Sequence, residues 1–368
     1  MVKNFILLSV FCFAFLFGSA QQKQKEDTNK PLSELLERTQ IGGQYFLTHE
    51  TNLTTKDNQF KLKRGYFTIK TQLDDMFSVR FTQDITLDTE GDDRGNVETR
   101  LKYLYLAMKP AKSGFFKHST IEFGMIHRPW LDFEQNINPY RAQGYMYTER
   151  YGLLNSADFG VGISGLLGEK MDKEYRENVS SDNAGKYGSY AFGLYNGPGY
   201  NDLELNNNKV MEGRLTLRPL PDFVPGLQFS YAFAYGKANI PHNNADFNMN
   251  VFYVSEQTRY FTFAGQYLTG KGSSFGTFYM PAFDDSYNTE GYSLFTEFKI
   301  PQTNFALFGR YDYFKKYHQS KNTEKYNTVV GGIAYRFLNN KLILSYDYSE
   351  HPYNNSQKLL ECIVEVKF

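Results

Sequence analysis

Apolar and polar residues alternate with a period of two along most of the chain, from about residue 41 to its end. In the last segment Leu360, Cys362 and Val364 alternate with Glu361 and Glu365. Because successive side chains of a strand point to opposite faces, this alternation predicts β-strands with one apolar face and one polar face. Sixteen such segments occur, beginning near residues 41, 59, 76, 97, 119, 157, 188, 209, 227, 249, 259, 289, 304, 325, 341 and 358.

The connections between these segments also differ in length in a regular way. Short gaps such as 74–75 alternate with longer polar ones such as 88–96 and 271–288. Short turns at one end and long loops at the other are typical of bacterial outer-membrane barrels. We therefore predict that residues 41–368 form a transmembrane antiparallel β-barrel of about 16 strands, with short periplasmic turns and long external loops. The charged stretch 169–187 is an exception and should lie on the short-turn side.

A soluble β-sandwich would also alternate, but its buried face would favour Val, Ile and Leu. Here the chain has 29 Tyr and 33 Phe, and many of them fall near strand ends on the apolar face. Tyr311, Tyr313, Tyr346 and Tyr348 are examples, and aromatic girdles at the two membrane interfaces have this composition. The low mean hydropathy of −0.52 also fits, because only alternate residues of such a barrel meet lipid. A membrane barrel is the favoured interpretation, and Phe368 at the end of the apolar face agrees with it.

The N-terminal residues 1–20 have the pattern of a secretory signal peptide. Lys3 precedes an apolar stretch over residues 5–17, and small residues follow at 18–20. The apolar stretch is too short to span a bilayer as a helix. Residues 21–40 are polar, with a short helix predicted after Pro31, and we expect them in the periplasm. The expected location is the outer membrane of a Gram-negative bacterium, in contact with its lipid and lipopolysaccharide.

Charge and composition exclude several classes of protein. The chain carries 40 Lys+Arg and 40 Asp+Glu, and this neutral balance argues against a nucleic-acid partner. Its two cysteines, Cys12 and Cys362, are too few and too far apart for a disulfide scaffold or a cysteine zinc site. The six histidines show no metal-ligand spacing, and no phosphate-binding loop, nucleophile elbow or zincin motif occurs. We expect no metal, no cofactor and no catalytic residue.

Several segments carry a resemblance to a known family. These are FGMIHRPW at 123–130, YTERYGL at 147–153 followed by FGVGISG at 159–165, and 192–202 followed by Gly213-Arg214-Leu215. The chain resembles the phosphate-selective porin O/P family of bacterial outer membranes, over most of its length at the level of strand order. The resemblance implies a sixteen-stranded barrel, commonly a homotrimer, whose third long loop folds inward. Residues 129–156, the longest connection, would be this constriction loop.

The polar face and the resemblance together predict a passive channel for small anionic or neutral solutes. The candidate pore-lining and constriction residues are Arg80, Arg100, Lys102, Arg128, Arg141, Glu149, Arg150, Arg214, Arg218 and Arg310. We predict a weak anion preference set mainly by Arg128 and its neighbours, because a guanidinium group stays ionised and matches an oxyanion. Carboxylates share the same faces, so a wall of paired charges that only braces the barrel is the alternative. The Glu149–Arg150 pair is predicted to brace the loop.

Two other function classes remain as alternatives. An outer-membrane enzyme would need a polar catalytic group on the lipid-facing wall or the rim, where the sequence shows aromatic and aliphatic residues. A non-conducting barrel for adhesion or secretion would normally carry a plug or an additional domain. Discrete ohmic current steps in a planar bilayer distinguish a channel from both.

Overall fold

The computed structural model describes residues 32–88, 92, 94–110, 114, 116–241, 245–318 and 322–368. The signal peptide expected at residues 1–20 lies outside them. The chain divides into two compact units, Met1–Thr39 and Gln40–Phe368. In the first unit α2 (Leu32–Glu37) is the short helix expected from the sequence. No described helix is both long and apolar enough to cross a membrane.

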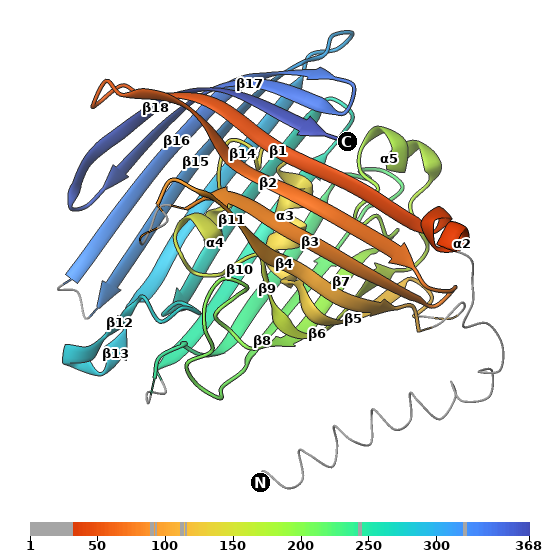
Figure 1. Cartoon of the computed structure of the whole chain (residues 1–368), viewed down its shortest axis with the longest axis horizontal. Coiled ribbons are helices and arrows are strands. Elements are labelled where there is room, and N and C mark those ends of the chain that lie inside the picture. The colour runs from red at the N-terminus through yellow and green to blue at the C-terminus, as the bar shows by residue number, and fades with distance from the viewer. Residues whose placement is uncertain are drawn as a thin grey trace, which may run out of the picture. The chain divides into compact units, whose positions relative to one another are not determined.

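Sixteen antiparallel strands close into one barrel, in which each strand pairs with its neighbours in sequence and β1 pairs with β18 (Figure 1). The strands are β1 (Thr39–Asn52), β2 (Asn58–Gln72), β3 (Phe77–Leu87), β4 (Val97–Met108), β5 (Ser119–His127), β6 (Ala157–Leu167), β7 (Gly188–Tyr195), β8 (Val210–Leu217), β9 (Gln228–Lys237), β10 (Asp246–Gln257), β11 (Phe261–Lys271), β14 (Asn288–Lys299), β15 (Phe305–His318), β16 (Asn322–Phe337), β17 (Asn340–His351) and β18 (Asn354–Lys367). The predicted fold class and strand number are confirmed. In the loop between β11 and β14, a separate pair of short strands, β12 (Tyr279–Met280) and β13 (Asp285–Ser286), precedes and follows a 3-10 turn, Pro281–Phe283.

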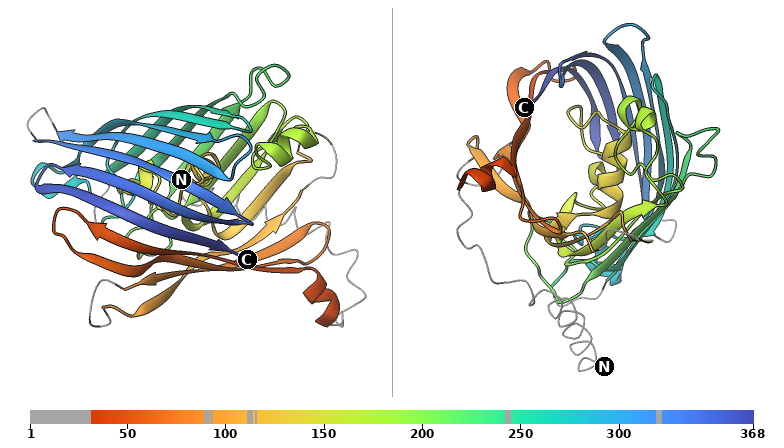
Figure 2. Two further views of the ribbon diagram at one scale, coloured as in Figure 1. Left: turned by 90° about the horizontal axis from the view of Figure 1, so that it is seen from above. Right: turned by 90° about the vertical axis from the view of Figure 1, so that its right-hand side faces the viewer.

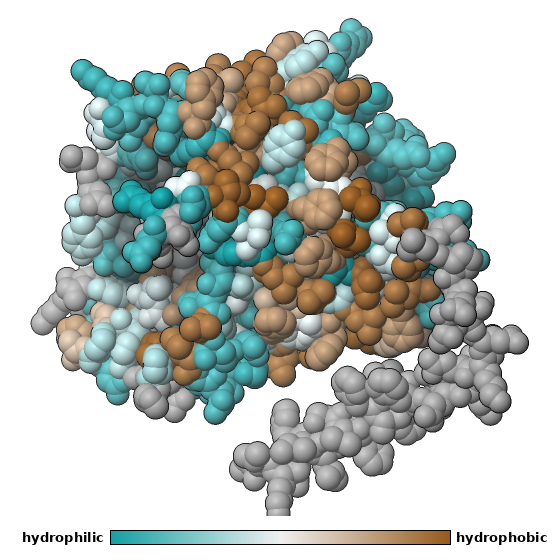
Figure 3. Space-filling view, viewed as in Figure 1, coloured by the Kyte–Doolittle hydropathy of each residue, from teal (hydrophilic) through white to brown (hydrophobic). Residues whose placement is uncertain are grey.

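The alternation seen in the sequence separates the two faces of the wall. On β18 Glu361, Ile363 and Glu365 are buried inside the barrel, whereas Leu360 and Cys362 are exposed on the outside. Apolar side chains dominate a broad region of the outer surface, and polar ones gather toward its margins (Figure 3). This surface is what a lipid-facing wall requires.

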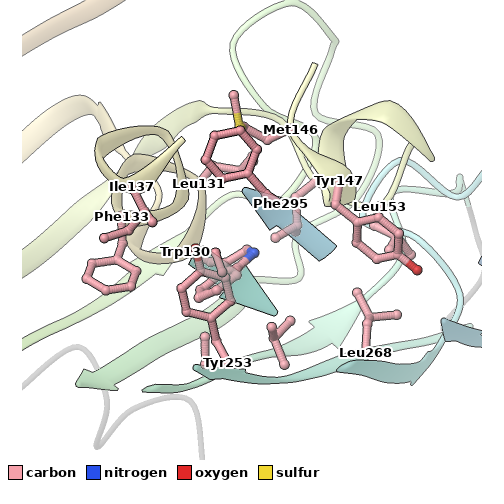
Figure 4. Close-up of a cluster of buried hydrophobic side chains, with 14 of the residues drawn as sticks. Trp130, Leu131, Phe133, Ile137, Met146, Tyr147, Leu153, Tyr253, Leu268 and Phe295 are labelled. Atoms are coloured by element: carbon pink, nitrogen blue, oxygen red, sulfur yellow. The ribbon is translucent and has the colours of Figure 1, made fainter. Parts of the chain in front are cut away.

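The third long connection enters the barrel, as predicted. It contains α3 (Pro129–Ile137) and α4 (Tyr147–Arg150), and both helices lie inside the ring of strands (Figure 2, right). Trp130, Leu131 and Phe133 on α3 are almost completely buried. Trp130 packs edge-on against Tyr253 of β10, with ring centroids 5.1 Å apart (Figure 4). The loop is therefore packed against the wall as a second layer.

One expectation about the inner face needs correction. The sequence suggested that the whole inner face is polar and wetted, but on β10 the inward residues Phe247, Met249 and Val251 are apolar and buried. Inward residues of the neighbouring strands, among them Phe295 and Phe308, belong to the same hydrophobic cluster. The physical reason is that the inward loop covers this part of the wall and removes it from water.

Connections at the two ends of the barrel are less regular than the sequence suggested. At the end that holds Phe368, the connection 168–187 contains α5 (Lys173–Asn178) and a small core of its own that includes Met171, Tyr175 and Ala184. At the opposite end, β17 and β18 form a long hairpin whose connection is as short as 352–353. We call these the turn side and the loop side of the barrel.

Candidate functional site

Open space in the lumen lies between the inward loop and the wall made by β1–β4 and β16–β18. The loop-side vestibule has a volume of about 590 Å³ and the turn-side vestibule about 620 Å³. A small space of about 90 Å³, which we call the neck, shares lining residues with both. Lys63, Gly144 and Tyr145 line both the loop-side vestibule and the neck, and Arg141 lines both the neck and the turn-side vestibule. These shared residues show that the neck adjoins both vestibules.

The charged side chains that line the neck are all cations, namely Lys63 and Arg64 on β2 and Arg141 on the loop. Each is paired with a carboxylate that is more deeply buried than itself: Lys63 with Glu361 at 2.6 Å, Arg64 with Asp84 at 3.4 Å, and Arg141 with Glu149 at 3.0 Å. The side chains of the cations are 11–19% exposed, and those of the carboxylates 0–8%. The water in the neck therefore meets the cationic ends of these pairs.

Tyr145 organises two of these cations. Its ring lies 5.2 Å from the guanidinium carbon of Arg64 and 4.7 Å from that of Arg141. Its hydroxyl accepts a hydrogen bond from Arg64 Nη2 at 3.1 Å, and its backbone carbonyl accepts one from Arg310 Nη1 at 2.7 Å. Cation–π contacts of this kind hold a guanidinium group without neutralising it. Tyr145 thus fixes the position of two charges in the neck.

Four of the predicted lining residues line the open lumen. Arg141 lines the neck, Arg150 lines the loop-side vestibule, and Arg80 and the largely buried Lys102 line the turn-side vestibule. Arg80 lies 4.5 Å from the centre of the Tyr103 ring and donates from Nη1 to His127 Nε2 at 2.9 Å. Since arginine can only donate, this contact requires the histidine tautomer with its proton on Nδ1.

The sequence analysis predicted that Arg128 lines the pore, but the structure shows that it does not. Its side chain is fully buried in the wall, where its Nε donates to Glu212 Oε1 at 2.6 Å and its Nη1 donates to the Gly197 carbonyl at 3.1 Å. The reason is that the Glu212 side chain on β8 is buried and needs a counter-charge. Arg128 therefore closes the base of the loop and does not contact a passing solute.

Arg214, Arg218 and Arg310 also differ from the prediction, because all three are buried and line none of the three spaces. Each donates hydrogen bonds to a connecting segment: Arg214 to the Pro129 carbonyl at 3.3 Å and to Asn183 at 3.2 Å, Arg218 to the Gly185 carbonyl at 3.2 Å and to the Tyr175 hydroxyl at 3.0 Å, and Arg310 to the Tyr145 carbonyl at 2.7 Å. They anchor the loop and the 168–187 connection to the wall.

The sequence analysis predicted that Glu149 and Arg150 pair with each other, but in the structure they do not. Glu149 pairs with Arg141 inside the loop, whereas Arg150 Nη1 lies 3.2 Å from Asp347 Oδ2 on β17. Each residue still braces the loop, one internally and one to the wall. Arg100 is partly exposed and pairs with Glu98 at 3.2 Å and Asp84 at 3.7 Å, and it lines none of the three spaces.

Lys63 and Arg64 are the functional candidates that the sequence reasoning missed. They are adjacent, yet both point into the lumen, so strict alternation assigns at least one of them to the wrong face. A signal was present, since the outward apolar residues change from even positions to odd ones along this strand, from Phe60 and Leu62 to Phe67 and Ile69. A β-bulge in β4, opposite Thr82 and Gln83, has the same effect and turns both Lys102 and Tyr103 inward.

Metal binding has no support in the described residues, because no group of three or more His, Cys, Asp or Glu side chains there could hold an ion. This leaves the charged lumen as the candidate functional site.

A closed barrel of sixteen antiparallel strands with a loop folded into its lumen is the architecture of outer-membrane porins, whose barrels are wide enough to leave an aqueous channel. The chain is similar in fold to OmpF of Salmonella typhi in a complex with daunomycin, with 12% identity, a TM-score of 0.60, and coverage of 90% of this chain and 97% of the other. It is also similar to an anion-selective porin from Comamonas acidovorans, with 11% identity, a TM-score of 0.58, and coverage of 90% and 99%.

A third similar structure is a loop-deletion mutant of OmpT, an outer-membrane protein of Vibrio cholerae, with 12% identity, a TM-score of 0.59, and coverage of 90% and 99%. No protein-family model matches the chain, and no curated protein matches it. At such low identities the similarity shows the fold alone.

Proposed function

We propose that the protein is an outer-membrane porin, a passive channel through which small hydrophilic solutes diffuse with a modest preference for anions. The proposal places it in the outer membrane of a Gram-negative bacterium after removal of residues 1–20. It extends to the phosphate-selective porin O/P family, whose sequence pattern the chain resembles, and to phosphate-like oxyanions among the solutes.

The arrangement of charge in the neck carries this proposal. Lys63, Arg64 and Arg141 line it, while their carboxylate partners lie deeper in the wall or in the loop. A solute in the neck is therefore closer to the positive member of each pair than to the negative one, and the field that it meets favours anions. Because each cation has a partner and salt screens charges over roughly 8 Å at physiological ionic strength, the preference should be modest.

The decisive experiment is a planar-bilayer recording of the purified protein in asymmetric KCl. We expect discrete ohmic steps and a reversal potential on the anion-selective side. Arg141→Gln should move the reversal potential toward cation preference, since Glu149 would then act without its partner. Arg259→Gln makes the same change of charge at an exposed turn between β10 and β11 and should leave the reversal potential unchanged.

Two results would contradict the proposal in different ways. A protein that inserts and stays electrically silent is a non-conducting barrel and not a porin. A conducting protein that is already cation-selective, or whose selectivity does not respond to Arg141→Gln, leaves a general porin without the proposed role for the neck.

We also propose a homotrimer in the membrane. One similar structure of the Vibrio cholerae protein is described as a trimer form, which supports this assembly by analogy. Native mass spectrometry in detergent should give three times the subunit mass, and a purely monomeric spectrum would refute it.

A further inference from the structure

The loop-side vestibule has a lining unlike that of the neck. It contains the partly exposed rings of Tyr145, Tyr151 and Tyr326, together with side chains of both charges and amides. Its volume of about 590 Å³ falls in the range of ordinary small-molecule sites. The vestibule is therefore large enough to hold a solute before it reaches the neck.

The aromatic rings of this vestibule are held in fixed positions. Tyr151 stacks on Phe314 with ring centroids 4.7 Å apart and an interplanar angle of 13°, and its hydroxyl lies 3.1 Å from Thr328 Oγ1. Tyr326 meets the edge of Tyr151 at 5.9 Å, and its hydroxyl donates to Glu324 at 2.7 Å. Such rings offer a flat apolar surface at little cost in conformational entropy.

The charged groups of the vestibule are paired. Asp347 Oδ2 lies 3.2 Å from Arg150 Nη1 and also accepts from Gln143 Nε2 at 3.0 Å. Glu361 pairs with Lys63. The lining thus places hydrogen-bond donors next to acceptors, with little net charge to attract an ion.

This combination matches one class of solute. A hydroxyl group both donates and accepts, so neighbouring hydroxyls of a sugar can bond to a carboxylate and to its cationic partner together. The C–H face of a pyranose ring is apolar and flat enough to lie on an aromatic ring. An anion gains less here than in the neck, because the partly exposed carboxylates Glu50 and Asp347 line the vestibule beside the cations Lys63 and Arg150.

We propose that the loop-side vestibule is a binding subsite for neutral saccharides built of pyranose rings. Sugar rings lie on the faces of Tyr151 and Tyr326, and their hydroxyls bond to the Asp347–Arg150 pair and to Lys63. The subsite rests on the proposed porin function only for the transport of the sugar; the binding itself does not depend on conduction.

Calorimetric titration of the whole protein in detergent with maltotriose, cellotriose and xylotriose tests the binding directly. We expect at least one trisaccharide to bind with a dissociation constant below about 10 mM, as a weak transport site requires. A polyethylene glycol of matched mass should give no binding heat. If none of the three sugars binds more strongly than this polymer, the subsite does not exist.

Two pairs of variants test whether the rings carry the binding. Tyr326→Leu and Tyr151→Leu each remove a ring, and each should weaken the binding of the sugar roughly fivefold. Tyr326→Phe and Tyr151→Phe keep the ring and serve as matched controls that should bind within about twofold of the original protein. Tyr326 is on the wall and not on the loop, so its variant keeps the test valid if Tyr151→Leu disturbs the loop. Equal binding by the Leu and Phe variants at both positions would overturn the proposal.

Single-channel recording with the bound trisaccharide separates this inference from the proposed function. Brief interruptions of the current that become more frequent with sugar concentration are expected, and Tyr326→Leu should shorten them. Ohmic current without calorimetric binding refutes the subsite and leaves the porin. Calorimetric binding by an electrically silent protein refutes the porin and leaves the subsite.

Discussion

Replacing Arg128 with alanine should destabilise the folded barrel and leave its ion preference unchanged. Arg128 and Glu212 form a fully buried pair, and Arg128 also donates to the Gly197 carbonyl. The alanine variant leaves a carboxylate buried without its partner. Removing one member of such a pair costs about 3–5 kcal/mol, because the remaining charge has lost both water and its counter-charge.

A charge-free pair at the same place gives the matched comparison. Arg128→Met with Glu212→Leu removes both charges and keeps most of the volume, so the cost should fall to less than half of that of Arg128→Ala. The Gly197 carbonyl still loses its hydrogen bond, which accounts for roughly 1 kcal/mol of the remaining cost. The comparison therefore separates the unpaired charge from the lost packing.

The assay is reversible urea unfolding of the protein in lipid vesicles, followed by tyrosine fluorescence and by mobility on an unheated gel. Reversal potentials of the folded variants are recorded in asymmetric KCl. A cost below about 1 kcal/mol for Arg128→Ala, or an equal cost for the charge-free pair, would show that the buried-charge argument fails. A clear shift of the reversal potential would show that Arg128 reaches the pore after all.

Other predictions follow from the loop and its anchors. Arg310→Met removes the hydrogen bond to the Tyr145 carbonyl, so the single-channel conductance should rise and become noisier; an unchanged conductance would show that this contact does not hold the neck. Trp130→Ala empties a fully buried site on α3 and should cost about 3–5 kcal/mol in the same urea assay, and a cost under 1 kcal/mol would mean that the loop is not packed as described. Burial raises the pKa of Glu134 on α3, in the loop and outside the strands, to about 7. The folded protein then holds a proton that the unfolded chain has released, so the free energy of unfolding should fall as the pH rises from about 5 to 7.5. Glu134→Gln should remove this dependence, and a profile that is the same in both proteins would refute it.

The fold was predictable because a barrel strand repeats the same simple pattern. One face meets lipid and the other does not, so the period of two survives in the sequence even where individual residues deviate. The inward loop was predictable from its length and from the resemblance. Its dry contact with β10 was not, since the inward Phe247, Met249 and Val251 become buried only when the loop covers them.

The roles of the arginines were not predictable from position along a strand. Arg128 and Glu212 are 84 residues apart in the sequence, and only the closed barrel brings them together. The odd or even position of a residue along a strand can place a cation on the inner face. It cannot show whether the cation meets water or a carboxylate there. Arg64 was missed for a different reason. It follows Lys63 directly and points to the same face, whereas strict alternation would place only one of the two on that face.

Lys63 and Lys102 lie where β2 and β4 depart from regular alternation. Their positions have a consequence for how such a channel can change over generations. Lys102 is an extra residue in β4, since the partner strand passes from Thr82 to Gln83 without an opposite residue for it. Lys63 lies in β2 between Leu62 and Phe67, where the outward apolar residues change from even to odd positions. In an ordinary strand the loss of one residue would move every side chain beyond it to the other face. Deleting either lysine would instead restore regular alternation, with the lipid-facing residues still outside. The barrel can therefore lose a lumen charge through a one-residue deletion that leaves its outer surface intact, and ion preference can diverge by changes in strand length as well as by substitution.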